Sequence, residues 1–294
     1  MLASARGGLW IFAGAVCLSF AAIFVALADL GPTATAFHRF LGATLLLGAW
    51  AAITRPKRVF SRGGTGMFVL AGLALAFDMG IWNRSIGILG PGLATLVVST
   101  QVLLVPVLAA LLLKAVPPRG IMAPALLCVV GIATFSFPTE HSHAGELLGV
   151  GLGLVAALSY ATYIVLLKGG ADRDDSPAPL KLLIVCVTGT IALGVAAPAL
   201  GESLVIPNLK TLLAIIGMAA VVQIGGWLLI LRGMKTTSAT SAGLVLVAQP
   251  VLAMVWDSLF FARPFGLREL LGGTLTLIAI IWGTWLANRA TPTS

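Results

Sequence analysis

The chain has 294 residues, of which 59% are apolar and only 10% are charged. Its mean hydropathy of +1.06 excludes an ordinary soluble domain and predicts an integral membrane protein. The net charge of +8 does not indicate nucleic-acid binding, because the basic residues lie in short loops between long apolar runs. The three cysteines lack metal-site spacing, so we expect Cys17, Cys128 and Cys186 to pack as apolar side chains.

Ten apolar runs are long enough to cross a bilayer, which requires about 20 residues in a helix. Only a helix satisfies its own backbone in lipid, so each run is expected to be helical. We expect the first run to be a spanning helix and not a removable signal peptide, because no small-residue cleavage site follows a short apolar core. In chain order the predicted spans are 8–28, 32–54, 64–84, 91–113, 119–138, 145–167, 179–200, 209–231, 238–261 and 267–288.

The basic residues are distributed unevenly between the two sides of this arrangement. Of the 18 Lys and Arg residues, 13 lie on the side of the N-terminus, 4 lie in the opposite loops, and Arg39 lies within a span. Loops rich in Lys and Arg face the cytoplasm. The distribution therefore predicts a multi-pass membrane protein with both termini in the cytoplasm.

Three sequence echoes indicate an internal duplication. "LSFAAIFVAL" at 18–27 returns as "LSYATYIVLL" at 158–167, and "PVLA" occurs at 106–109 and at 250–253. "DMGIW" at 78–82 is matched by "QIGGW", which ends at Trp227. We expect two units, 1–140 and 141–294, each with five spans. An odd number of spans inverts the second unit relative to the first, and inverted repeats are typical of secondary transporters.

Two charged residues are predicted inside spans, where a charge must face protein or water because exposure to lipid costs about 2.5–3.5 kcal/mol at the helix centre. At 1.5 Å per residue, Asp78 lies about 21 Å from the inner end of its span and Arg39 about 10 Å from the outer end of its own, so both reach a similar depth. One interpretation is a structural Asp78–Arg39 pair. The other is that Asp78 binds a substrate ammonium group while a backbone or Asn83 donor binds its carboxylate.

Aromatic and neutral polar side chains in mid-span are candidates for lining a central cavity. A tyrosine far from both interfaces needs a partner for its hydroxyl group, and Trp82 lies one helical turn after Asp78 on the same face. Matched prolines in mid-span are candidate gates, because each removes a backbone hydrogen bond. The predicted substrate-binding residues are Phe20, Asp78, Trp82, Gln101, Tyr160, Tyr163, Gln223 and Trp227, and the predicted gating residues are Pro106 and Pro250.

The stretch "GMKTTSATSAGLVLVAQPVLAMVWDSLFFARPFGLRELLGG" at 233–273 resembles the EamA-type members of the drug/metabolite transporter superfamily. The first unit contains a looser copy at 83–120, and "HRFLGATLLL" at 38–47 resembles the family's second span. The resemblance implies an all-α integral membrane fold of ten transmembrane helices in two inverted five-helix repeats. It also implies a central cavity lined mainly by helices 1, 3, 4, 6, 8 and 9.

Within that family the chain is most similar to the aromatic amino acid exporters of bacterial inner membranes. It departs from the family in the loop that usually carries an acid, which reads "LKAVPPR" in the first unit and "FARPFG" in the second. Small four-helix relatives couple to protons through a glutamate in helix 1, whereas helix 1 here has no acid before Asp29. Coupling by that route is therefore not expected.

The expected function is export of small metabolites, above all aromatic amino acids, by alternating access through a cavity between the repeats. Alternatives are export of drugs, nucleosides or organic cations, a channel, or a membrane enzyme, although no hydrolase, metalloprotease or nucleotide-binding motif occurs. We expect no cofactor, no metal and no nucleic acid as partners. Membrane lipid is expected to surround the protein, and a monomer is expected to be the working unit.

Asp257 and His38 are predicted to lie at the membrane–water interface. His141 and His143 are predicted to lie in a solvated loop.

Overall fold

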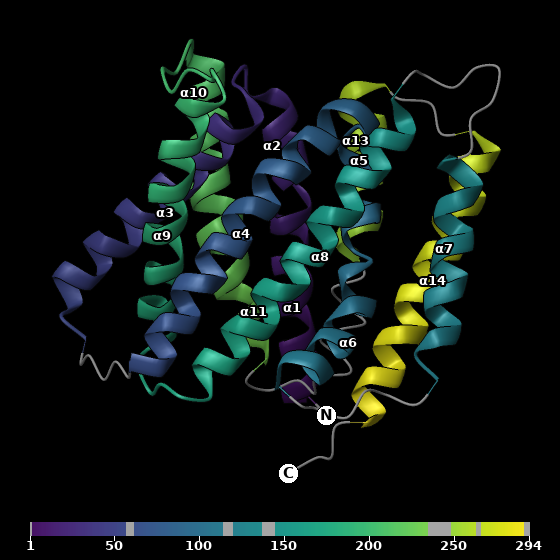
Figure 1. Ribbon diagram of the computed structural model, residues 1–294, viewed down its shortest axis with the longest axis horizontal. Coiled ribbons are helices and arrows are strands. Elements are labelled where there is room, and N and C mark those ends of the chain that lie inside the picture. Colours follow the sequence, from purple (N-terminus) through teal and green to yellow (C-terminus); the bar gives the residue numbers. More distant parts are fainter. Residues whose placement is uncertain are drawn as a thin grey trace.

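The computed structural model describes residues 2–56, 62–113, 120–136, 145–234, 248–262 and 266–290. These residues are almost entirely helical, and no strand occurs among them. The helices, shown in Figure 1, are α1 Leu2–Ser19, α2 Ala21–Leu27, α3 Pro32–Thr54, α4 Arg62–Leu89, α5 Pro91–Val98, α6 Gln101–Leu113, α7 Met122–Ser136, α8 Glu146–Ala171, α9 Ala178–Ala199, α10 Leu209–Gly217, the π-helix η1 Met218–Gly226, α11 Trp227–Met234, α13 Ala248–Phe261 and α14 Leu267–Ala290.

The predicted spans coincide with these helices, and the ninth is described from Ala248 onward. By length and composition, seven helical segments in the described part are long and apolar enough to cross a bilayer, and α7 and α13 contribute shorter apolar helices. Large apolar side chains face outward along the bundle, with Ile53 81% exposed and Leu111 73% exposed. Such a surface suits lipid and not water, so the all-α membrane fold is confirmed.

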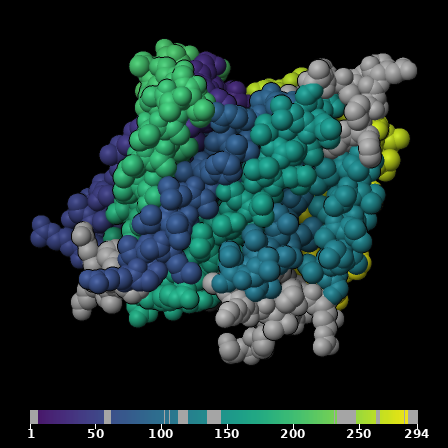
Figure 2. Space-filling model, in the orientation of Figure 1, coloured from purple at the N-terminus to yellow at the C-terminus, as the bar shows by residue number. Residues whose placement is uncertain are grey.

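Corresponding helices of the two predicted units run in opposite directions. By the sequence echoes, the first span, α1–α2, corresponds to α8, and α4 corresponds to the continuous segment α10–η1–α11. In Figure 1, α1 begins and α14 ends at the same end of the bundle, and α4 leaves that end while α10–η1–α11 returns to it. We call this end the termini side and the other end the far side. Across the face drawn in Figure 2, α9, α4 and α8 lie side by side as diagonal ridges.

Three spans predicted as single helices are irregular in the structure. The first span changes from α1 to α2 at Phe20, and the fourth changes from α5 to α6 at Ser99 and Thr100. The eighth contains η1, in which the backbone forms a wider π-helical turn. π-Helical segments inside α-helices are frequent at functional sites.

Helices α7 and α14 approach each other closely at Gly131. A Cβ atom added at Gly131 would stand 2.7 Å from the backbone N of Thr276 and 2.8 Å from the carbonyl O of Gly272. Backbone atoms cannot rotate away as a side chain can. Small residues at such crossings let membrane helices pack through direct van der Waals contact.

We expect Gly131→Ala to lower the free energy of unfolding by about 1–3 kcal/mol, because the added methyl group forces α7 and α14 apart. Thermal unfolding in detergent measures the change. Gly66 is a matched control on α4, since an added Cβ there meets no atom within 4 Å. Gly66→Ala is expected to leave stability unchanged or slightly raised. Equal effects of the two changes would contradict the close α7–α14 contact.

Candidate functional site

A cluster of buried charged and polar side chains lies in the middle of the bundle. Asp78 on α4 is 0% exposed, Arg39 on α3 is 7% exposed and Gln223 on η1 is 4% exposed. The Nε atom of Arg39 donates a hydrogen bond to Oε1 of Gln223 over 3.0 Å. Residues 184 positions apart and from different repeats therefore meet at this point.

The Asp78–Arg39 pair is not formed as a direct contact. Neither carboxylate oxygen of Asp78 has a hydrogen-bond partner among the described residues. The suggested Asn83 donor is also engaged elsewhere, since its Nδ2 donates to the carbonyl of Pro32 over 2.8 Å. A buried carboxylate without a hydrogen bond is energetically costly, and such residues in spans mark functional sites.

Aromatic rings surround the charged cluster. The rings of Tyr160 and Tyr163 on α8 stack with centroids 5.7 Å apart and 9° between their planes. Tyr163 is 2% exposed, and both rings pack against the hydrophobic core. Trp82 is 5% exposed, and its indole Nε1 has no hydrogen-bond partner in the described part of the chain. The cluster thus combines one basic side chain, one acidic side chain and several ring faces.

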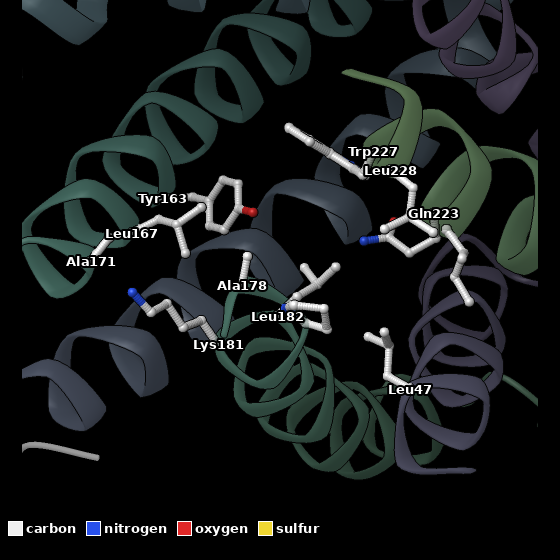
Figure 3. Close-up of a pocket in the computed structure, with 12 residues that line it drawn as sticks. Leu47, Tyr163, Leu167, Ala171, Ala178, Lys181, Leu182, Gln223, Trp227 and Leu228 are labelled. Atoms are coloured by element: carbon white, nitrogen blue, oxygen red, sulfur yellow. The ribbon is translucent and has the colours of Figure 1, made fainter. Parts of the chain in front are cut away.

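A cavity of about 250 Å³ opens beside this cluster. Its volume is near the lower end of ligand pockets, roughly 300 Å³. Figure 3 shows Tyr163 on α8 and Gln223 on η1 at different sides of the cavity, with the Tyr163 hydroxyl group directed inward. The lining residues are Leu47, Tyr163, Leu167, Ala171, Ala178, Pro179, Lys181, Leu182, Gln223, Ile224, Trp227 and Leu228.

The cavity reaches the termini side of the bundle, because Ala171 ends α8 and Ala178 begins α9 on that side. Its lining comes from the second, sixth, seventh and eighth spans, whereas the family resemblance implied helices 1, 3, 4, 6, 8 and 9. The difference arises because α4 packs closely against α8, so that Asp78 and Trp82 lie behind the lining and not on it. Access to Asp78 from the cavity therefore requires side chains or helices to move.

The predicted substrate-binding residues are distributed over four places. Tyr163, Gln223 and Trp227 line the cavity, while Asp78, Trp82 and Tyr160 are packed next to that lining. Phe20 lies at the α1–α2 joint, where its ring stacks on Trp256 at 4.9 Å and 18°. Gln101 begins α6, and its Oε1 has no partner among the described residues. Neither Phe20 nor Gln101 belongs to the described lining.

The two predicted gating prolines do not coincide with the irregular points of the described helices. Pro106 lies within α6, which remains helical from Gln101 to Leu113. Pro250 is buried within α13, which is described from Ala248 onward. The changes in helix geometry at Phe20, at Ser99–Thr100 and in η1 are the alternative points at which these spans can bend.

Two residues predicted to lie at the interface are buried instead. Asp257 is 0% exposed, and its Oδ2 accepts a hydrogen bond from the backbone N–H of Gly92 over 2.9 Å. His38 is 8% exposed, with Nε2 at 2.9 Å from the carbonyl O of Leu204. Each hydrogen bond joins one repeat to the other, so these side chains stabilise the contact between the repeats. The predicted loop residues His141 and His143 lie outside the described residues.

The sequence analysis missed Glu202, which follows α9 and binds the start of α3 on the far side. Its Oε2 accepts hydrogen bonds from the backbone N–H groups of Thr33 and Ala34, at 2.7 and 2.8 Å. Its Oε1 accepts from Nη2 of Arg84 at 2.9 Å and from the Thr33 hydroxyl group at 3.0 Å. A carboxylate here caps the start of α3 and suits the positive end of the helix dipole. The only signal in the sequence is that this loop carries one of just 10 acidic residues.

A second contact on the far side joins Asp29 to the loop before α10. The Asp29 carboxylate accepts hydrogen bonds from Asn208 at 2.9 Å and from Lys210 at 3.2 Å. These two donors hold the pKa of Asp29 below its usual value. The contact lies outside the spans and is exposed to solvent.

We expect this contact to make a small, pH-dependent contribution to stability. An aspartate whose pKa is lowered by folding stabilises the protein above its unfolded pKa, about 3.9, and this contribution is lost as the pH falls through the folded value. The difference in unfolding temperature between the wild type and Asp29→Asn should therefore be constant from pH 5 to pH 8 and shrink below about pH 4. A difference that persists unchanged to pH 3 would contradict the assignment.

Comparison with known proteins agrees with this architecture. The model of the EamA-like transporter family matches residues 5–137 and 147–285. One solved crystal structure of a protein aligns over 98% of this chain and 99% of its own length, with a TM-score of 0.65 and 16% sequence identity, which supports the fold alone. None of the curated proteins compared with the chain matches it. With two family matches that together cover most of its length, the chain belongs to the EamA-like transporter family.

Proposed function

We propose that the protein exports small metabolites, with aromatic amino acids as its main substrates, by alternating access. In this proposal it acts as a monomer in a bacterial inner membrane with both termini in the cytoplasm, as its loop charges predict. The two repeats are the units 1–140 and 141–294. Membership of a transporter family supports the general activity, and the substrate class is argued from the buried cluster.

The observation that carries the proposal is the buried Asp78 carboxylate, which has no hydrogen-bond partner among the described residues. A substrate ammonium group would supply the missing partner. The stacked Tyr160 and Tyr163 rings and the adjacent Trp82 offer faces on which an aromatic side chain can pack. The tryptophan and tyrosine rings also favour a nearby cation.

Contacts on the two sides of the bundle support alternating access. On the far side, Glu202 and Asp29 connect the repeats through hydrogen bonds and ion pairs. On the termini side, the cavity beside Tyr163 and Gln223 is open. An exporter that loads substrate from the cytoplasm needs this combination in its loading state. Release would require the far-side contacts to break while the cavity closes.

Organic cations are a second candidate substrate class. The same carboxylate of Asp78 would bind an amine without a carboxylate group, and the cavity lining is largely apolar. A cationic drug would bind to Asp78 and to the aromatic ring faces, and it would make no ion pair with Arg39. The substrates tested must therefore include molecules that differ only in their charged groups.

The experiment is a counterflow assay with the purified protein in liposomes. Liposomes loaded with phenylalanine, tyrosine or tryptophan should accumulate the labelled amino acid, and the rate should saturate. Leucine and an amphiphilic organic cation test the side-chain preference, and a proton gradient tests coupling. Protein-free liposomes are the control. Absence of counterflow for every amino acid would overturn the proposal, and non-saturating flux would indicate a channel.

A further inference from the structure

We propose that Arg39 binds the substrate carboxylate and so determines that the protein prefers amino acids to amines. This inference rests on the proposed function, because it assigns a second half of the same binding site. It gives Arg39 a role different from that of a counter-charge to Asp78. The proposal depends on the bond between Arg39 and Gln223 and on the charges of the cavity.

Gln223 holds Arg39 in a position suited to binding. Only the Nε atom of Arg39 takes part in a hydrogen bond within the described part of the chain, and its partner is Oε1 of Gln223. A guanidinium group has five N–H donors, so four remain on the two terminal nitrogens. Those nitrogens form the fork that pairs with a carboxylate through two parallel hydrogen bonds. Gln223 itself lines the cavity, so the Arg39 guanidinium group is one side chain away from that lining.

The charges along the cavity favour an anionic group. Among its described lining residues, Lys181 is the one charged side chain, and no acid belongs to the lining. Lys181 donates to the backbone carbonyl of Asp174, and a carbonyl does not neutralise the ammonium charge. A carboxylate entering from the termini side therefore passes Lys181 before it reaches Arg39. In the low dielectric of the bundle this attraction is stronger than in water.

The opposite charges of Arg39 and Asp78 match the two charged groups of an amino acid. The described residues show no direct ion pair between the two side chains, and the Asp78 carboxylate has no hydrogen-bond partner among them. A zwitterion between them would give each side chain a partner of opposite charge. An amine would satisfy Asp78 alone, and a carboxylic acid would satisfy Arg39 alone. The pair therefore favours a molecule that carries both groups close together.

Three compounds with one ring separate the roles: phenylalanine, phenethylamine without the carboxylate, and phenylpropionate without the ammonium group. We expect Arg39→Gln to raise the half-saturating concentration for phenylalanine and phenylpropionate by about 10- to 100-fold, because a charged hydrogen-bonded pair is lost. The value for phenethylamine should stay within about twofold. Arg39→Lys keeps the charge without the fork and should give an intermediate result.

Equal losses for all three compounds, or unchanged phenylalanine counterflow, would overturn the role of Arg39 and leave the transport proposal standing. Failure of the wild type with phenylalanine would instead overturn the transport proposal. Each variant is first checked for monodispersity and for its unfolding temperature. Gln223→Ala is the second variant, because it removes the hydrogen-bond acceptor of Arg39 without removing a charge. It should reproduce the same selective loss at smaller amplitude.

Discussion

We expect Asp78→Asn to lower phenylalanine counterflow by about 10- to 100-fold, the range for loss of one hydrogen-bonded charge pair. The substitution preserves the shape of the side chain and removes the charge that would meet the substrate ammonium group. Because Asp78 makes no hydrogen bond with the described residues, the change removes no such bond from the folded protein. The same counterflow assay and thermal unfolding in detergent give the two measurements.

Asp257 provides a matched control, because it is the other aspartate in a span that is 0% exposed. Its carboxylate accepts the Gly92 N–H, so Asp257→Asn weakens a charge-assisted bond. We expect Asp257→Asn to lower stability by about 1–2 kcal/mol. Asp78→Asn should instead act mainly on transport. Normal counterflow in a well-expressed Asp78→Asn protein would remove Asp78 from the binding site.

The second large effect is expected at Glu202. Its carboxylate accepts four hydrogen bonds, and its side chain is 13% exposed while Arg84 is 30% exposed. Glu202→Ala uncaps α3 and leaves the Arg84 guanidinium group without its carboxylate. We expect the free energy of unfolding to fall by about 2–3 kcal/mol, the sum of a lost helix cap and a charged hydrogen bond.

An exposed ion pair serves as the comparison for Glu202. Lys168 and Asp172 pair one turn apart at the end of α8, with side chains 68% and 54% exposed. Because water screens such pairs, Asp172→Asn should change stability by no more than about 0.5 kcal/mol. Similar effects of Glu202→Ala and Asp172→Asn would show that the far-side contact contributes little to the folded state.

The helices could be predicted from the sequence because lipid imposes a strong constraint. Each apolar run of about 20 residues has to form a helix, and short loops with Lys and Arg separate the runs. The π-helix at Met218–Gly226 could not be predicted in this way, because an apolar run has the same composition in either helix type. It depends on packing against neighbouring helices.

Prediction of the candidate site was partial for a related reason. Asp78 and Arg39 were placed at a similar depth by counting residues along their helices. Whether Arg39 pairs with Asp78 or with Gln223 depends on side-chain geometry across 184 positions, which periodicity does not record. Asp257 was assigned to the interface because it is near the end of a span. Its burial follows from the contact between α13 and α5, which are in different repeats.

Two acidic side chains of the second repeat accept hydrogen bonds from the first turns of helices in the first repeat. Glu202 caps α3 and Asp257 caps α5. A ribosome completes these two helices long before either acid has been synthesised. Until then, the amide groups at both helix starts must be solvated by water or lipid headgroups at the membrane surface. During synthesis the first repeat therefore lacks the hydrogen bonds to the starts of α3 and α5. The last of these bonds can form only after Asp257 has been added to the chain.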